Sequence, residues 1–169
     1  YNEVDLSSVI AIRKKYQDQF VKKHNTKLGF MSFFVKASVN SLQSFPHLNA
    51  ELHQDELIVK KYYDIGIAVA TDEGLVVPVL RGADKLSSAE IELGIAELAT
   101  KSREKKITLQ ELQGGTFSIT NGGVFGSLMS TPLLNPPQVG ILGMHKIMEK
   151  PLAVDGEIVI RPVMMLAVT

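Results

Sequence analysis

The sequence predicts an α/β domain, a two-layer α+β arrangement in which a mixed sheet is flanked by helices. Segments with helical periodicity and short β-rich runs follow one another along the chain, and no repeat or low-complexity linker separates them. A length of 169 residues is that of one ordinary domain, and 45% hydrophobic with 21% charged residues is typical of a globular protein. We therefore expect one domain over residues 1–169.

Helix signals occur at four places. Apolar residues recur at helical spacing from Val9 to Phe20, which predicts a first helix, and a second is expected over residues 32–45. The Ser-Ser-Ala-Glu of residues 87–90 forms a capping box that opens a third helix. The same pattern in Thr-Leu-Gln-Glu at residues 108–111 predicts a single short turn.

The predicted strands are short runs rich in β-branched residues. Gln54-Asp55 separates two of them and indicates a hairpin, and Asp155-Gly156 favours a type I′ turn between the last two. The remaining runs that we interpret as strands are residues 64–71, 74–80, 115–120, 139–147, 152–154 and 157–169. Strands and helices in this order predict the mixed sheet.

Composition excludes several kinds of function. The absence of cysteine rules out disulfides, thiolate metal sites and cysteine nucleophiles. A formal net charge of zero creates no field that would attract nucleic acid or an anionic membrane. No apolar run approaches the roughly 18 residues of a membrane span. The four histidines lack metal-site spacing, so we expect no metal.

The segment FSITNGGVFGSLMSTPLLNPPQ, residues 117–138, differs from ordinary core sequence. It lacks the Lys-Ser/Thr that follows the last glycine of a phosphate loop, and the glycine spacing is not that of a dinucleotide fingerprint. Asn121-Gly122 favours positive φ, so a hairpin turn is the plain interpretation. Thr120 at a strand end beside glycines, with further hydroxyls at Ser127, Ser130 and Thr131, also fits a donor to an oxyanion. The residues alone leave both interpretations open.

Long blocks of the chain resemble a known family. They are YNEVDLS, LGFMSFFVKA, FPHLNAEL, DIGIAVATDEGLVVPVLR, GGTFSITNGGVFGSLMSTPLLNPPQ and ILGMHKI. Together they closely resemble the catalytic core of the 2-oxoacid dehydrogenase acyltransferases, and within that family the dihydrolipoyl succinyltransferases of the 2-oxoglutarate dehydrogenase complex. The resemblance runs from end to end of the chain.

The resemblance implies a fold like that of chloramphenicol acetyltransferase. It also implies homotrimers that assemble into a cubic core of twenty-four subunits, with 2-oxoglutarate dehydrogenase and dihydrolipoyl dehydrogenase as partner subunits. The implied reaction moves a succinyl group between coenzyme A and a dihydrolipoyl group carried on a separate lipoyl domain, without a metal. Residues 1–169 would be the catalytic core, without the lipoyl and peripheral-subunit-binding domains. The expected location is the cytoplasm of a bacterium or the mitochondrial matrix of a eukaryote.

The family also implies catalytic groups. A thiol that attacks a thioester needs a general base, and the carbonyl oxygen that becomes an oxyanion needs a donor. The donor of the family matches Thr120, and base and threonine come from neighbouring subunits of the trimer. The base lies in a His-x-x-x-Asp-Gly motif that we expect directly after Thr169, and none of the four histidines present fits it. This chain alone is therefore expected to be inactive.

Further site residues follow from the same resemblance. Ser127 and His145 match positions suited to the terminal carboxylate of a succinyl group. Arg13 matches an arginine that would brace the catalytic loop through the aspartate of the motif.

Two other functions stay open at this point. One is a trimeric assembly scaffold without chemistry, and the other is transfer of a different acyl group within the same family. The gene sequence beyond Thr169 discriminates between enzyme and scaffold, because only the enzyme needs the histidine motif.

Overall fold

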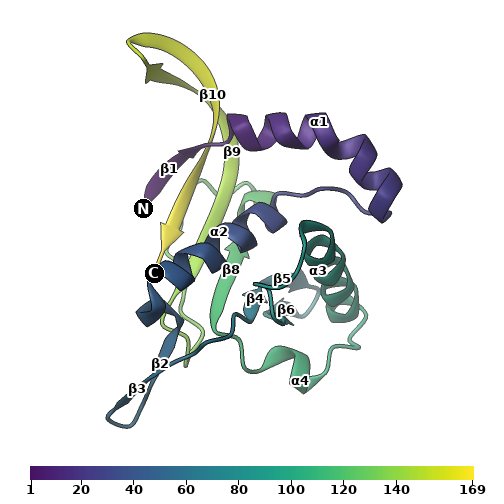
Figure 1. Cartoon of the computed structure of the whole chain (residues 1–169), viewed down its shortest axis with the longest axis vertical. Coiled ribbons are helices and arrows are strands. Elements are labelled where there is room, and N and C mark those ends of the chain that lie inside the picture. The colour runs from purple at the N-terminus through teal and green to yellow at the C-terminus, as the bar shows by residue number, and fades with distance from the viewer.

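A six-stranded mixed sheet organises the chain, which a computed structural model describes from Tyr1 to Thr169 (Figure 1). The strands, in their order across the sheet, are β1 (Asn2–Asp5), β10 (Glu157–Val168), β9 (Ile141–Val154), β8 (Phe117–Asn121), β4 (Ile65–Ile67) and β7 (Val79–Leu80). β8 runs parallel to both β4 and β9, and the other pairs are antiparallel. The predicted mixed sheet is confirmed, and β1 was not predicted.

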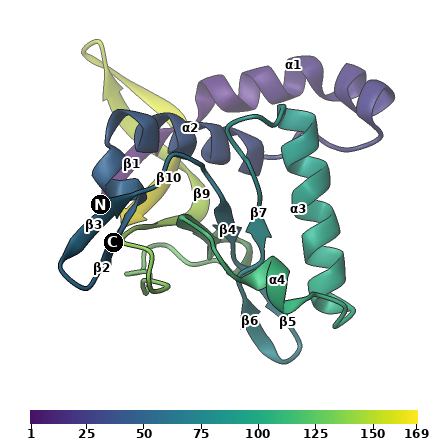
Figure 2. The same cartoon turned by 60° about the horizontal axis from the view of Figure 1, so that its bottom comes forward.

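Helices cover one face of this sheet. They are α1 (Ser7–His24), α2 (Met31–Ser44), α3 (Ser88–Arg103) and the short α4 (Leu109–Leu112). The predicted capping boxes are both present, at Ser87 and Thr108. Figure 2 shows α3 alongside β7, with α4 near the lower end of α3. A core of buried apolar side chains, among them Val35, Ile91 and Ile119, lies between α2, α3 and the sheet.

Two small hairpins stand apart from the main sheet. One pairs β2 (Ala50–His53) with β3 (Glu56–Val59), as predicted, and a 3₁₀ turn (Pro46–Asn49) leads into it. The other pairs β5 (Val69–Thr71) with β6 (Gly74–Val76). The predictions of single strands over 64–71 and 74–80 are wrong, because each run divides between this hairpin and β4 or β7 of the main sheet.

β9 and β10 extend beyond the sheet as a long two-stranded ribbon (Figure 1). The predicted separate strands 139–147 and 152–154 are one continuous β9, so that prediction is wrong. Pro151 is tolerated because β8 pairs with β9 only from Ile141 to Met144, which leaves the outer edge of the ribbon unpaired. The predicted turn is confirmed, since Asp155 and Gly156 have φ angles of 51° and 84°.

The two faces of the sheet carry different residues. Along β8, Phe117 and Ile119 belong to the helix-covered core, so Ser118 and Thr120 point to the opposite face. The segment between β8 and β9, residues 122–140, packs against that face, and we name it the crossover loop. It begins with a 3₁₀ turn, η2 (Gly123–Phe125). The candidate site lies between the crossover loop and the sheet.

Candidate active site

Thr120 is the half-buried residue next to the end of β8, and its hydroxyl is free. The polar neighbours use their side chains within the chain: the Ser118 hydroxyl donates to Gln138 Oε1 at 2.5 Å, and Asn121 Oδ1 accepts from the Gly123 amide at 2.9 Å. The Thr120 hydroxyl has no such partner. A donor that the fold leaves unused is available to a ligand.

The space beside Thr120 is narrow on the β9 side, because its register partner on that strand lacks a side chain. Its register partner on β9 is Gly143, where a Cβ atom would lie 2.6 Å from Cγ of Pro132. On the β4 side, Gly66 pairs with Ser118, two positions before Thr120, and a Cβ at Gly66 would lie 2.9 Å from Cγ1 of Val77. Pro132 and Val77 can therefore come close to the sheet on either side of β8 only because these glycines are present. This arrangement brings backbone close to any molecule that reaches Thr120.

The turn after Thr120 is not a hairpin. Gly122 has a φ of −78°, and the first left-handed residue is Gly126 with a φ of 80°. The prediction of a positive-φ pair at Asn121-Gly122 is wrong, because β8 and β9 run parallel and parallel strands need a crossover instead of a tight turn. The chain instead bends through a short 3₁₀ turn over 123–125.

Ser127 is fixed to β9 through its backbone. Its carbonyl accepts from the Lys146 amide at 2.8 Å and its own amide donates to the Gly122 carbonyl at 3.1 Å. At Gly123 the loop touches the strand so closely that a Cβ atom would lie 2.5 Å from the His145 carbonyl oxygen. The Ser127 hydroxyl has no partner in the chain, so it remains a candidate for the substrate contact that the sequence predicted.

His145 lies behind the crossover loop and is only 1% exposed. Its Nδ1 lies 2.8 Å from the Met165 carbonyl oxygen, and its Nε2 lies 2.9 Å from the hydroxyl oxygen of Ser130. Both ring nitrogens are thus occupied within the chain. Ser130 is the functional neighbour that sequence reasoning missed: its hydroxyl was noticed, but only the fold shows which histidine it meets.

Arg13 belongs to the other layer of the molecule. Its Nε donates to the Leu28 carbonyl at 2.8 Å, and its guanidinium lies 4.0 Å from the centroid of the Phe30 ring. These contacts join α1 to the segment that leads into α2. The helices lie on the face of the sheet opposite Thr120, so within this chain the structure gives Arg13 a role in holding α1 and no contact with the site.

The structure brings three of the four predicted residues together. His145 follows Gly143 by two positions on β9, and Gly143 pairs with Thr120, so the Cα atoms of Thr120 and His145 are about 8 Å apart by strand geometry. Ser127 is next to Gly122, where a Cβ atom would lie 3.1 Å from the Ser127 Cβ. Hydroxyls and an imidazole therefore gather at the end of β8.

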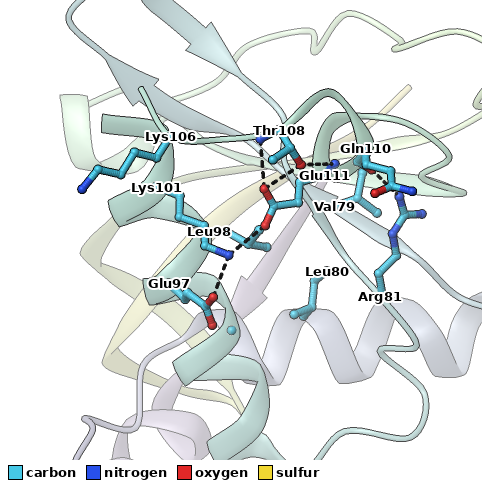
Figure 3. A pocket seen from close by; sticks show the side chains of 11 residues that line it. Val79, Leu80, Arg81, Glu97, Leu98, Lys101, Lys106, Thr108, Gln110 and Glu111 are labelled. Atoms are coloured by element: carbon cyan, nitrogen blue, oxygen red, sulfur yellow. Dashed lines mark hydrogen bonds and ion pairs between the residues drawn. The ribbon is translucent and has the colours of Figure 1, made fainter. Parts of the chain in front are cut away.

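A separate polar cavity of about 860 Å³ lies between α3, α4 and β7 (Figure 3). Lys101 crosses it and pairs with Glu97 at 2.8 Å and with Glu111 at 2.9 Å. Both hydrogen bonds raise the pKa of Lys101. The hydrogen bond from Lys101, together with those from Thr108, lowers the pKa of Glu111 to about 2. The charges that line this cavity are all paired within the chain, Arg81 with Asp64 and Lys106 with Glu104 from outside the cavity.

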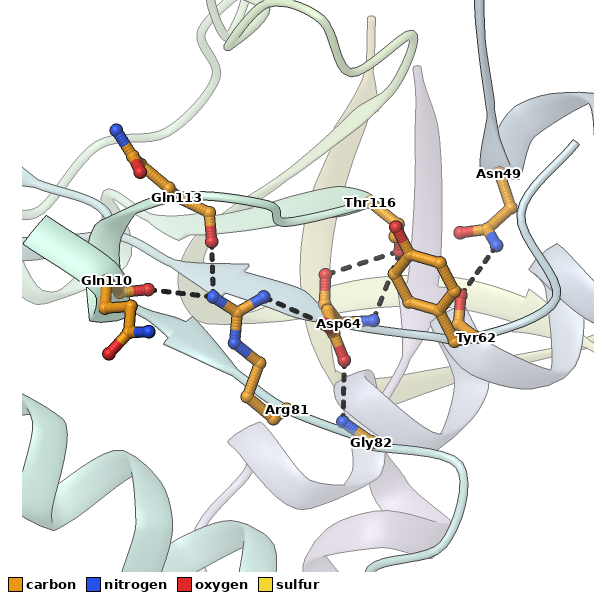
Figure 4. A network of polar contacts seen from close by, with 8 residues as sticks. All are labelled: Asn49, Tyr62, Asp64, Arg81, Gly82, Gln110, Gln113 and Thr116. Atoms are coloured by element: carbon orange, nitrogen blue, oxygen red, sulfur yellow. Dashed lines mark hydrogen bonds and ion pairs between the residues drawn. The ribbon is translucent and has the colours of Figure 1, made fainter. Parts of the chain in front are cut away.

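Arg81 holds the other side of α4 (Figure 4). It donates to the Asp64 carboxylate at 2.9 Å and to the backbone carbonyls of Gln110 and Gln113, while Asp64 also accepts from the Gly82 amide at 2.7 Å. Every partner of Arg81 thus belongs to the chain itself. We interpret this network as the set of contacts that anchors α4 to the sheet.

No group of three or more histidine, aspartate or glutamate side chains is arranged to hold a metal ion. None of the helices combines the length and the apolar character that crossing a membrane requires.

Comparison with known proteins agrees with this arrangement. The family described as 2-oxoacid dehydrogenases acyltransferase (catalytic domain) matches residues 1–169. The dihydrolipoyllysine-residue succinyltransferase component of the 2-oxoglutarate dehydrogenase complex from Bacillus subtilis is 65% identical over 157 residues, which are 93% of this chain and 38% of the relative. The component of the same name from Rickettsia typhi is 57% identical over 169 residues, 100% of this chain and 42% of the relative. This chain thus spans less than half of the length of these relatives.

Solved structures show the same fold. The cubic core of the pyruvate dehydrogenase multienzyme complex superimposes with a TM-score of 0.94 at 35% identity, over 99% of this chain and 69% of that one. Chloramphenicol acetyltransferase superimposes with a TM-score of 0.55 at 10% identity, over 98% of this chain and 75% of that one, which confirms the predicted fold. The chain belongs to the family of 2-oxoacid dehydrogenase acyltransferases and corresponds to their catalytic domain.

Proposed function

We propose that the complete protein transfers a succinyl group between coenzyme A and a dihydrolipoyl group, as the core of a 2-oxoglutarate dehydrogenase complex. The observation that carries this proposal is the free hydroxyl of Thr120 at the end of β8, opposite Gly143 on β9. The names of the Bacillus and Rickettsia relatives support succinyl as the acyl group.

The chemistry of the transfer explains why this hydroxyl matters. As a thiol sulfur forms its bond to the thioester carbon, the carbonyl electrons move onto oxygen and create an oxyanion. Thr120 donates its hydroxyl hydrogen to that oxygen, and the oxyanion then collapses as the bond to the leaving sulfur breaks. A donor of this kind is worth on the order of 100- to 1,000-fold in rate.

The second catalytic group is a general base. It removes the proton of the attacking thiol and returns a proton to the leaving thiolate. We assign this role to the histidine of the His-x-x-x-Asp-Gly motif that the family resemblance places after Thr169. The imidazole of His145 is unsuited to it, because both of its nitrogens are engaged within the chain.

Assembly into trimers is the second part of the proposal. The crossover loop exposes large apolar side chains and carries no charged residue. These exposed side chains are Val124, Phe125, Leu128, Met129, Leu133 and Leu134. An apolar patch of this kind on a soluble domain marks an interface. We infer that it packs against a second copy, which would place the base of one subunit beside Thr120 of another.

The transfer assay tests the proposed reaction directly. The complete protein is given dihydrolipoamide with either succinyl-CoA or acetyl-CoA, and kcat/KM is measured for each. We expect a preference for succinyl-CoA of at least about tenfold, since a site built to bind a carboxylate rejects an analogue that lacks it. A preference for acetyl-CoA would favour transfer of another acyl group, and assembly without any transfer would favour a scaffold.

A further inference from the structure

Two buried side chains hold the crossover loop against the sheet near Thr120. Between Leu128 and Val139, Pro132 and Gln138 are buried and the other ten residues are exposed. No backbone hydrogen bond joins this stretch of the loop to a strand. The distance between the loop and the sheet therefore depends on side-chain contacts.

Pro132 makes the contact beside Thr120. It lies over Gly143, the register partner of Thr120 on β9, where a Cβ atom would be 2.6 Å from Cγ of the proline. Leu142 and Met144 on either side belong to the core, so Gly143 faces the same side of the sheet as Thr120. The proline ring thus bounds the space next to the Thr120 hydroxyl on the β9 side.

Gln138 makes the second contact, on β8 itself. The Ser118 hydroxyl donates to its Oε1 at 2.5 Å, and the two residues are only 1% and 8% exposed, respectively. Ser118 precedes Thr120 by two residues, so it lies about 6.6 Å away along the strand on the same face. On the other side of the amide, a Cβ atom at Gly115 would lie 2.7 Å from Nε2 of Gln138. The amide is therefore seated closely on β8, between Gly115 and Ser118.

We propose that Gln138 is a positioning residue for the transfer reaction, and that its hydrogen bond to Ser118 sets how far the crossover loop stands from Thr120. A thioester carbonyl has to lie within hydrogen-bond distance of the Thr120 hydroxyl to be stabilised as an oxyanion. The loop bounds the space in which that carbonyl lies. When the contact of Gln138 is lost, the loop moves outward and no longer holds the carbonyl at the hydroxyl. This inference rests on the proposed function.

The expected effect of Gln138 lies in the rate and not in substrate affinity. The residue carries no charge, and its Oε1 is already bound to Ser118. Misplacement of a reacting group by about 1 Å can lower a rate on the order of 100-fold, although a neutral hydrogen bond contributes little to stability. A merely structural role would reduce the amount of folded protein and leave the kcat of the folded fraction unchanged.

A double-mutant cycle in the complete protein tests the positioning role. Transfer from succinyl-CoA to dihydrolipoamide is measured for the wild type, Gln138→Leu, Thr120→Ala and the double variant, each shown by sedimentation to be assembled. Gln138→Leu should lower kcat about tenfold and change KM by less than about twofold. In the Thr120→Ala background, the same substitution should lower kcat by less than about twofold, because the hydroxyl at which it places the carbonyl is gone.

Serine variants separate positioning from stability. Ser118→Ala removes the same hydrogen bond from its other end and should reproduce the loss in kcat. Ser118→Thr keeps the hydroxyl and should retain most of the activity. Ser102→Ala is the matched control, since it removes a buried serine hydrogen bond elsewhere, to the Leu98 carbonyl at 2.7 Å, and should leave kcat unchanged.

Three results would overturn the inference. They are an unchanged kcat in Gln138→Leu, equal fold losses from this substitution with and without the Thr120 hydroxyl, and a similar loss of kcat in Ser102→Ala. If Gln138→Leu does not fold, the same cycle with Ser118→Ala decides. A large effect of Thr120→Ala with an additive cycle refutes only the role of Gln138, whereas a Thr120→Ala protein that retains its kcat refutes the proposed function.

Discussion

The imidazole of His145 donates to the carbonyl of Met165 across 2.8 Å, at a point where strand pairing gives that carbonyl no partner residue on β9. The neighbouring Lys146 amide is directed away, to the Ser127 carbonyl in the crossover loop. One bulge therefore joins β9 to β10 through a side chain and to the crossover loop through the backbone. The position of the loop over Thr120 depends on it.

Replacing His145 with leucine should destabilise the fold by about 1–3 kcal/mol, because the partly buried Met165 carbonyl and the Ser130 hydroxyl lose their partner. Chemical denaturation of the purified domain measures the change. His145→Asn is the control, since its amide can still donate to Met165, and it should recover much of the loss. Equal stability of the leucine variant and the wild type would show that the hydrogen bonds contribute nothing.

Alanine substitutions at Gly123 and Gly122 test how closely the turn after Thr120 packs on β9. A Cβ at Gly123 would lie 2.5 Å from the backbone carbonyl of His145, whereas the nearest atom to one at Gly122 is the Ser127 Cβ at 3.1 Å. Gly123→Ala should therefore cost roughly 1–3 kcal/mol as the loop is pushed from β9, and Gly122→Ala should cost less. Thermal unfolding of both variants compares them. A Gly123→Ala protein as stable as the wild type would contradict the close contact.

The Lys101–Glu111 pair makes the anchoring of α4 dependent on pH. The hydrogen bonds of Lys101 and Thr108 lower the pKa of Glu111 from an ordinary 4.5 to about 2. The carboxylate form is the one the fold favours, so its stabilisation is complete above about pH 4.5 and is lost as the pH falls toward 2.

The Glu111→Gln variant should show a shallower fall in thermal midpoint across that acid range. The pair is partly exposed, so the difference between variant and wild type should be small and should shrink in high salt. Parallel pH profiles for the two proteins would refute the assignment.

Assembly through the crossover loop is tested with two exposed leucines. Leu133 in the loop is 87% exposed and Leu109 on α4 is 69% exposed. If the loop packs against a second copy, Leu133→Ser should shift the complete protein toward monomers in sedimentation, and Leu109→Ser should not. Unchanged assembly of the Leu133 variant would remove the loop from the interface.

The sequence predicted the elements that depend on local chemistry. The capping boxes at Ser87 and Thr108 and the turn at Asp155-Gly156 need only neighbouring residues, and all three are present. The division of 64–71 and 74–80 was missed, because it depends on which distant strand each half meets. Periodicity does not contain that information.

Of the candidate site, too, the sequence predicted what depends on local residues and missed what depends on the fold. Thr120 was identified by its place at a strand end and by resemblance, and the structure leaves its hydroxyl free. The partner of His145 could not be read from the sequence, since Ser130 is 15 positions away and meets it only through the crossover loop. The hairpin prediction at Asn121-Gly122 failed for a related reason: the residues fit a tight turn, but the parallel pairing of β8 and β9 does not allow one.

The central claim is that Thr120 stabilises the oxyanion of a thioester transfer, and the most direct test is the kcat of Thr120→Ala in the complete protein. We expect kcat for transfer from succinyl-CoA to dihydrolipoamide to fall about 100-fold or more, with little change in KM, because the hydroxyl acts mainly in the transition state. Thr120→Ser, which keeps the hydroxyl, should retain most of the activity. A fall of less than about threefold in the alanine variant would contradict the role assigned to Thr120.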